Sequence, residues 1–258
     1  MAESIQVEKG FAEVNGTRLY YEVAGEGHPL VLNHGGLVDH HLWDDSFEEF
    51  ARHFKTVRYD MRGFGASGLL KKGMEPYSLE KDLRALLQFL GIEKIYILGL
   101  SMGGGSAIDF TLQYPEMVDA LITVGAGLSG FEADEESERQ NKQNWSAVLE
   151  AFKSGDIPRT VEVTLRWWTD GPNRTPEQVD PVARERIRVM TTRNYERPDD
   201  EDVEPVGMTP PAAGRLAKIH VPTLVIVGSE DVAEIQTIAG ALVNGIAGAQ
   251  KVVIPGTA

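Results

Sequence analysis

Residues 95–105 constrain the fold of this chain more than any other stretch. They read Ile-Tyr-Ile-Leu-Gly-Leu-Ser-Met-Gly-Gly-Gly, and apolar residues recur at helical spacing after Gly105. The apolar start predicts a buried β-strand, and the residues after the glycines predict an α-helix. Between them lies the pattern Gly-x-Ser-x-Gly, in which Gly99 and Gly103 leave room for a sharp turn. The stretch therefore predicts a strand–turn–helix unit that exposes Ser101 Oγ above a sheet.

The surroundings of Ser101 are suited to stabilising negative charge. Met102 lies at the start of the predicted helix, where backbone N–H groups attract anions. A second N–H donor is expected from the glycine-rich loop at 34–37, and we assign it to Gly36, with Leu37 as the alternative. His34 in the same loop can be interpreted as a catalytic base, but we favour a histidine that packs the loop.

The order of the other elements indicates an α/β fold with a mostly parallel sheet. Asn15-Gly16 predicts a tight hairpin between strands at 4–13 and 17–24, because both turn positions favour positive φ. Short continuous apolar runs suit strands that are buried on both faces. The run at 30–32 is of this kind, and further strands are predicted at 56–59, 95–98, 118–124, 221–227 and 251–254. Helices are predicted at 44–53, 77–90 and 235–246.

Residues 126–216 differ in character from the rest of the chain. They are polar, acidic and patterned as helices at 135–153, 161–168 and 181–195, with an acidic loop at 199–204. We predict a helical cap inserted into an α/β core made of 1–125 and 217–258. Trp167 and Trp168 either line a pocket under this cap or pack it onto the core.

A second glycine pattern, Gly63 to Gly68, also matches the dinucleotide-binding sequence G-x-G-x-x-G. We reject a dinucleotide site because no helix is predicted directly after it and because it follows a later strand than the first βα unit. The string D-x-R-G-x-G-x-S at 60–67 is better interpreted as a structural turn, with Asp60 and Arg62 forming an ion pair.

Composition excludes several classes of partner. The net charge of −14 over 258 residues disfavours nucleic acids and anionic membranes. There is no cysteine, which is compatible with a reducing compartment, and neither a secretory signal nor an apolar run of membrane-spanning length is visible. We expect a cytoplasmic monomer or weak homo-oligomer that needs no metal and no cofactor.

A carboxylate for the site is expected after the strand at 221–227. Gly228-Ser229-Glu230-Asp231 follows that strand, and functional groups collect at the carboxyl ends of strands in open α/β sheets. We choose Asp231 as the acid of a catalytic triad because it follows Ser101 in the chain order Ser…Asp. Glu230 is the alternative.

The motifs together resemble the α/β-hydrolase superfamily, and more narrowly small bacterial carboxylesterases, enol-lactonases and related serine hydrolases. The resemblance covers nearly all of the chain except 130–215. It rests on H-G-G at 34–36, D-x-R-G-x-G-x-S at 60–67, G-L-S-M-G at 99–103 and G-S-E-D at 228–231.

The resemblance implies specific roles at the site. It implies Ser101 as nucleophile, Asp231 as acid, and the N–H groups of Met102 and Gly36 as an oxyanion hole. A serine at the turn argues against relatives that use aspartate there, such as haloalkane dehalogenases and epoxide hydrolases.

The chain departs from the family at its end. Family members place the catalytic histidine in a P-G-x-x-H loop after the last strand, and this chain reads Pro-Gly-Thr-Ala at 255–258. Its six histidines all precede Asp231: His28, His34, His40, His41, His53 and His220. Loss of such a base costs about a millionfold in a serine protease. The helix that follows the histidine in the family is also missing, so we expect an exposed apolar patch on the sheet.

Three interpretations stay open. We favour a C-terminally truncated short-chain carboxylesterase that acts on a small-molecule ester; a lactonase or carbon–carbon bond hydrolase is the alternative within the fold. In a second interpretation His34, His40 or His41 substitutes as a weak base. In the third, the protein is a ligand-binding or sensor protein on a hydrolase scaffold.

Overall fold

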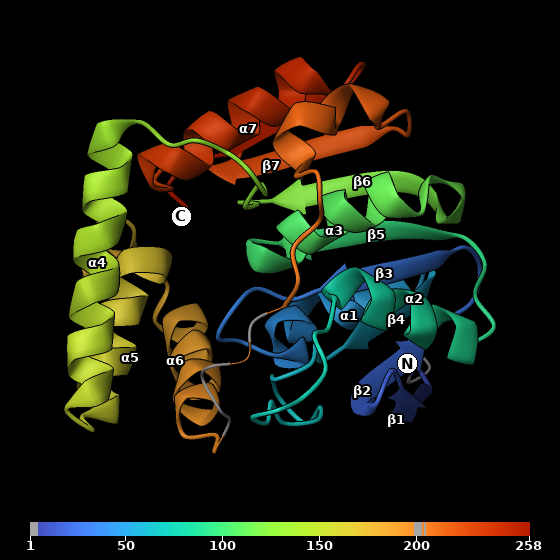
Figure 1. The fold of residues 1–258 in the computed structure, drawn as a ribbon, viewed down its shortest axis with the longest axis horizontal. Coiled ribbons are helices and arrows are strands. Elements are labelled where there is room, and N and C mark those ends of the chain that lie inside the picture. Colours follow the sequence, from blue (N-terminus) through green and yellow to red (C-terminus); the bar gives the residue numbers. More distant parts are fainter. Residues whose placement is uncertain (1–4, 199–202, 204) are drawn as a thin grey trace.

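The computed structural model describes residues 5–198, 203 and 205–258, and its centre is one eight-stranded sheet (Figure 1). The strand order is β1-β2-β4-β3-β5-β6-β7-β8. The pairs β1–β2 and β2–β4 are antiparallel, and all later pairs are parallel. The strands are β1 (Val7–Val14), β2 (Thr17–Ala24), β3 (Pro29–Asn33), β4 (Lys55–Tyr59), β5 (Ile95–Leu100), β6 (Val118–Val124), β7 (Thr223–Gly228) and β8 (Gln250–Ile254).

The N-terminal hairpin forms as its turn residues predict. Asn15 has φ 46° and Gly16 has φ 69°, so both lie in the left-handed region that a two-residue hairpin of this type requires. Val14 therefore pairs with Thr17, and the register continues to Val7 opposite Ala24. Residue 4, the first of the strand expected at 4–13, lies outside the described residues.

Helices cover both faces of the sheet, as expected for this fold class. The helices α2 (Leu79–Phe89), α3 (Met102–Gln113) and α7 (Ala233–Gly245) pack on one face, and α1 (Asp44–Ala51) packs on the other. Alternation along β5 explains this, because Ile97 joins the core of the first face and Leu98 joins that of the second. Ser78 caps α2 by accepting a hydrogen bond from the Lys81 amide, as its position predicts.

The three long helices between β6 and β7 pack together at one side of the molecule, next to the ends of the parallel strands (Figure 1). They are α4 (Glu135–Lys153), α5 (Ile157–Leu165) and α6 (Pro181–Tyr195), and a π-helical turn at Arg166–Asp170 continues α5. The second helix begins earlier than expected because Asp156 caps its N-terminus. Most of the expected acidic loop at 199–204 lies outside the described residues, and the division into core and cap stays a prediction.

The Asp60–Ser67 turn corrects one expectation, because Asp60 and Arg62 do not pair with each other. Arg62 binds the carboxylate of Asp82 on α2 through two hydrogen bonds of 2.7 and 2.8 Å. Asp60 instead accepts hydrogen bonds from the backbone N–H and the ring Nδ1 of His40, at 2.7 and 2.8 Å. The turn directs the two side chains to different neighbouring elements, where each buried charge finds a partner.

The edge strand β8 leaves apolar side chains in contact with solvent. Val252, Val253 and Ile254 are 40%, 46% and 40% exposed. Across the helices that the structure describes, none has the length and apolarity needed to cross a membrane.

A buried carboxyl group on α3 makes the stability of the fold depend on pH. Asp109 is 8% exposed and accepts a hydrogen bond of 2.9 Å from Ser129 Oγ. Burial disfavours its charged form and raises its pKa to about 6. The folded state therefore binds this proton more tightly than the unfolded state, and stability is lost as the pH rises from about 4 to 6.

We predict that Asp109→Asn stabilises the protein at neutral pH by about 1–2 kcal/mol, because the amide carries no charge to desolvate. The gain should vanish near pH 4, where the wild-type carboxyl is protonated in the fold. Urea unfolding of both proteins at the two pH values measures the difference. An equal effect at both pH values would contradict the assignment.

Candidate active site

Ser101 occupies a strained turn between β5 and α3. Its φ and ψ are 52° and −117°, outside the regions that side-chain-bearing residues ordinarily adopt. The backbone holds it there from both sides. The Ser101 N–H donates to Val124 O at 2.9 Å, and Ser101 O accepts from the amides of Gly105 and Gly127 at 3.0 and 3.2 Å.

The glycines around Ser101 are required by close backbone contacts. A Cβ on Gly99 would lie 2.2 Å from the carbonyl oxygen of Gly103. A Cβ on Gly103 would lie 2.3 Å from the carbonyl oxygen of His34. The strand, the helix and the loop after β3 therefore meet at distances that only glycine permits.

The glycine-rich loop at 34–37, which we call the oxyanion loop, lies next to the start of α3. Gly36 faces Met102, because a Cβ on Gly36 would lie 3.8 Å from Met102 Sδ. Leu37 follows with φ 61°, a left-handed conformation that is costly for leucine. The structure thus brings Gly36, Leu37 and Met102 together around Ser101, and their assignment as N–H donors remains a prediction.

Asp231 reaches the same site from the loop after β7. Its Oδ2 accepts a hydrogen bond of 2.7 Å from the Gly228 amide. Burial raises the pKa of Asp231, against the opposing effects of that hydrogen bond and of the charge on Arg174. Glu230, the alternative acid, accepts a hydrogen bond of 3.0 Å from Ser229 Oγ and does not line the cavity described next.

A cavity of about 350 Å³ joins these residues. It lies between the carboxyl ends of the strands and the helices α5 and α6, and its wall is predominantly apolar. Asp231 is the sole ionisable side chain among the described residues that line it. The lining residues include Leu42, Leu100, Ser101, Val124, Thr164, Trp168, Thr169, Ile187, Thr191, Ile226, Asp231, Ile235, Ile254, Thr257 and Ala258.

Of the three candidate pocket residues, Trp168 is among the described residues that line this cavity, whereas His34 and Trp167 are not. His34 is fully buried: its Nδ1 bonds to Gly35 O at 2.7 Å, and its Nε2 accepts from the Met61 amide at 2.9 Å. Burial lowers the pKa of His34, so it stays neutral with both ring nitrogens engaged. Trp167 stacks on Trp168 with ring centroids 4.2 Å apart, and of the two only Trp168 lines the cavity.

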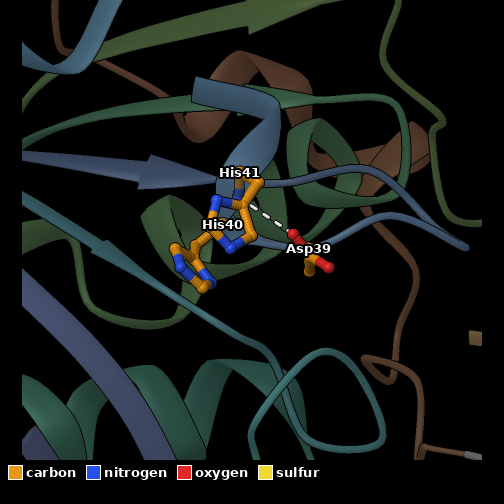
Figure 2. A group of neighbouring side chains, drawn as sticks. All are labelled: Asp39, His40 and His41. Carbon is orange, nitrogen blue, oxygen red and sulfur yellow. Dashed lines mark hydrogen bonds between the residues drawn. The ribbon is translucent and has the colours of Figure 1, made fainter. Parts of the chain in front are cut away.

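The other histidines also lie outside this cavity; all six are among the described residues, and none lines it. Asp39, His40 and His41 form a separate group whose potential metal-ligand atoms lie within 4.8 Å of one another (Figure 2).

The members of this group already have partners in the protein. Asp39 Oδ1 accepts from the His41 amide at 2.9 Å, and His40 Nδ1 bonds to Asp60. His41 Nδ1 bonds to Asp44 at 3.0 Å. These contacts orient the side chains without a metal, and we assign them a structural role. This group was not predicted, although its three consecutive residues are all of types that bind metals.

The part of the cavity wall that comes from α5, the π-helical turn and α6 was not predicted either. Thr164 comes from α5, Thr169 from the π-helical turn, and Ile187 and Thr191 from α6. Ile187 and Thr191 are four residues apart and therefore share one face of α6. Only the packing of these helices against the sheet brings all four residues into the wall of the cavity that contains Ser101.

Comparison with known proteins agrees with this architecture. Residues 28–258 match the alpha/beta hydrolase fold family. The chain is similar to an uncharacterised protein of Mycobacterium tuberculosis, with 34% identity over 117 residues that cover 45% of this chain and 34% of that protein. This chain therefore aligns with about a third of the length of that relative.

Solved structures resemble the chain over almost its full length. A hydrolase from Pseudomonas aeruginosa superimposes with a TM-score of 0.72 and 26% identity, covering 98% of this chain and 91% of that one. The enol-lactonase from Burkholderia xenovorans gives a TM-score of 0.72 with 24% identity and coverages of 95% and 91%. The chain belongs to the alpha/beta hydrolase fold family.

Proposed function

We propose that the protein is a serine hydrolase of small neutral carboxylic esters. The observation that carries this proposal is the position of Ser101. It lies in a strained turn at the start of α3 and opens on an apolar cavity that also contains Asp231. Strain of this kind at a side chain facing a cavity is typical of catalytic sites.

The proposed reaction proceeds through an acyl-enzyme. Ser101 Oγ attacks the ester carbonyl carbon while a base takes the hydroxyl proton, and the amides of Gly36 and Met102 stabilise the oxyanion. The same base then protonates the departing alcohol. Water, activated by that base, hydrolyses the acyl-enzyme and releases the carboxylic acid and free Ser101.

The base is a separate part of the proposal. No histidine is among the described residues that line the cavity, whereas Thr257 and Ala258 are. A residue joined to Ala258 would therefore begin at the wall of the cavity that Asp231 also lines. We propose that a histidine introduced at this place can act as the base, with Asp231 orienting its ring.

The residues of the cavity wall favour neutral, apolar substrates. No lysine or arginine is present among the described residues of the wall, so a substrate carboxylate would find no cationic partner there. This argues against substrates such as carboxylated dienes, which carbon–carbon bond hydrolases cleave. Lactones are neutral too, and they remain the second candidate because the fold is shared with an enol-lactonase.

A substrate panel tests the ranking of esters over lactones. We expect p-nitrophenyl acetate and butyrate to be turned over faster than simple lactones, and esters of long acids to be slow because the cavity holds about 350 Å³. Steady-state kcat/KM for each substrate is the measurement, on protein that carries a histidine after Ala258. Faster turnover of lactones than of every ester would replace the first candidate by the second.

A fluorophosphonate probe separates catalysis from ligand binding. We expect it to label Ser101 covalently in the same histidine-bearing protein, with the modified peptide identified by mass spectrometry. Absence of labelling would favour a binding protein on a hydrolase scaffold.

A further inference from the structure

We propose that Asn194 of α6 is a positioning residue for the oxyanion loop. The inference rests on the proposed function, since it concerns the predicted N–H donors around Ser101. This role would connect α6 to the loop at 34–37, although the two segments are far apart in the sequence.

The contacts of Asn194 join three parts of the molecule. Its Nδ2 donates to the carbonyl oxygen of Leu37 at 3.2 Å and to Met190 O of its own helix at 3.0 Å. Its Oδ1 accepts a hydrogen bond of 3.2 Å from the Gly65 amide. The side-chain amide therefore uses its donor and its acceptor groups on different loops, which fixes its orientation.

Leu37 needs such a partner because of its backbone conformation. Its φ of 61° is left-handed, which costs leucine about 1–2 kcal/mol. A conformation of this kind persists only where the surroundings hold it. Asn194 holds the carbonyl of the peptide that follows Leu37, and the preceding peptide units carry the N–H groups of Leu37 and Gly36. Fixing one side of Leu37 thus restrains the direction of the predicted donors.

The same end of α6 is fastened to the neighbouring turn. Arg197 donates to the carbonyl oxygens of Gly65 and Ser67. Thr191 and Ile187, about one and two helical turns before Asn194 on α6, line the cavity. The position of α6 therefore determines both the cavity wall and the support of the oxyanion loop, so movement of this helix would loosen both.

The variant Asn194→Asp tests the inference with a change of one group. The amide nitrogen becomes a carboxylate oxygen, which cannot donate to Leu37 O and repels it. Asn141→Asp is the matched control: Asn141 joins α4 to Glu234 of α7, so the same substitution breaks a contact between insertion and core away from the oxyanion loop. Asn194→Ala, which removes the donor without adding charge, is the second variant.

Hydrogen–deuterium exchange of residues 34–38 is the first measurement, and it needs no catalysis. We expect exchange there to be at least about tenfold faster in both Asn194 variants and unchanged in Asn141→Asp, because the loop loses its tether. Exchange at 34–38 that matches wild type in folded Asn194 variants, or that rises equally in Asn141→Asp, would overturn the inference.

Ester kinetics are the second measurement, made on protein with a histidine after Ala258. We expect kcat to fall about 10–100-fold in Asn194→Asp with KM within about threefold, because loss of a complete oxyanion donor costs about 100–1,000-fold. If exchange accelerates as expected but no protein, wild type included, turns over esters, the proposed function fails and the positioning role stands. A change in KM alone would make Asn194 a cavity residue and contradict the positioning role.

Discussion

Appending a single histidine after Ala258 is expected to increase ester hydrolysis by at least about tenfold, from the residual rate that binding and an oxyanion hole supply without a base. Thr257 and Ala258 line the cavity that contains Ser101 and Asp231, so the added ring can approach both side chains. A full triad histidine is worth about a millionfold in a serine protease. One histidine on an unsupported end should recover only a fraction of that, because its ring is not held in place.

Appended glutamine provides the matched control, since it adds a polar side chain without a base. Initial rates with p-nitrophenyl acetate compare the two proteins. Equal rates would contradict a base at this position. Added imidazole should also raise the rate of ester hydrolysis by the unextended chain, as the appended histidine does, because a small free base can occupy the same cavity.

Ser101→Ala shows whether the gained activity uses the proposed nucleophile. Nucleophile and base act as a unit, so each matters little when the other is missing. We therefore expect Ser101→Ala to remove the whole gain from the histidine-extended protein and to have a small effect on the unextended chain. A gain that survives Ser101→Ala would show that the histidine attacks the ester by itself.

Gly99→Ala is expected to destabilise the protein by about 3 kcal/mol or more, because overpacking forces backbone shifts. The new Cβ would lie 2.2 Å from the carbonyl oxygen of Gly103, and backbone cannot move aside as a flexible side chain does. Since this contact joins β5 to the start of α3, the variant should also displace Ser101. Urea unfolding and probe labelling measure the two effects.

Gly240→Ala is the control for this substitution. Gly240 lies within α7 and a Cβ there meets no atom within 4 Å. Alanine favours helix over glycine by about 1 kcal/mol, so this variant should be as stable as wild type or more stable. Similar losses in both variants would refute the steric explanation for Gly99.

Much of the fold could be predicted because its signals are local. Each of these signals affects the backbone of residues close to it in the chain. Examples are the turn at Asn15-Gly16, the helix cap Ser78 and the apolar run of β5. Helices α4 and α6 have the bounds predicted from their periodicity. Such features depend on backbone propensity and on the spacing of apolar side chains, which the order of residues already contains.

In the candidate site too, the features that depend on contiguous residues could be predicted and those that depend on distant residues could not. Ser101 and its glycines could be recognised because the strand, the turn and the helix are contiguous in the chain. Which tryptophan lines the cavity could not be recognised: Trp167 and Trp168 are adjacent, and the packing of the π-helical turn decides between them. The ion pair expected within the Asp60–Ser67 turn was wrong for a similar reason, since Arg62 finds Asp82 on a helix that comes later in the chain.

Local patterns of residues were enough to predict the strand–turn–helix unit around Ser101, the α/β class and the order of the elements, because these follow from contacts between near neighbours. The apolar cavity, the burial of His34 away from it and the hydrogen bond from Asn194 to Leu37 became visible only in the folded protein. These depend on side chains from distant segments that meet when the inserted helices pack against the sheet. No local pattern contains such contacts, since their geometry exists only in the folded chain.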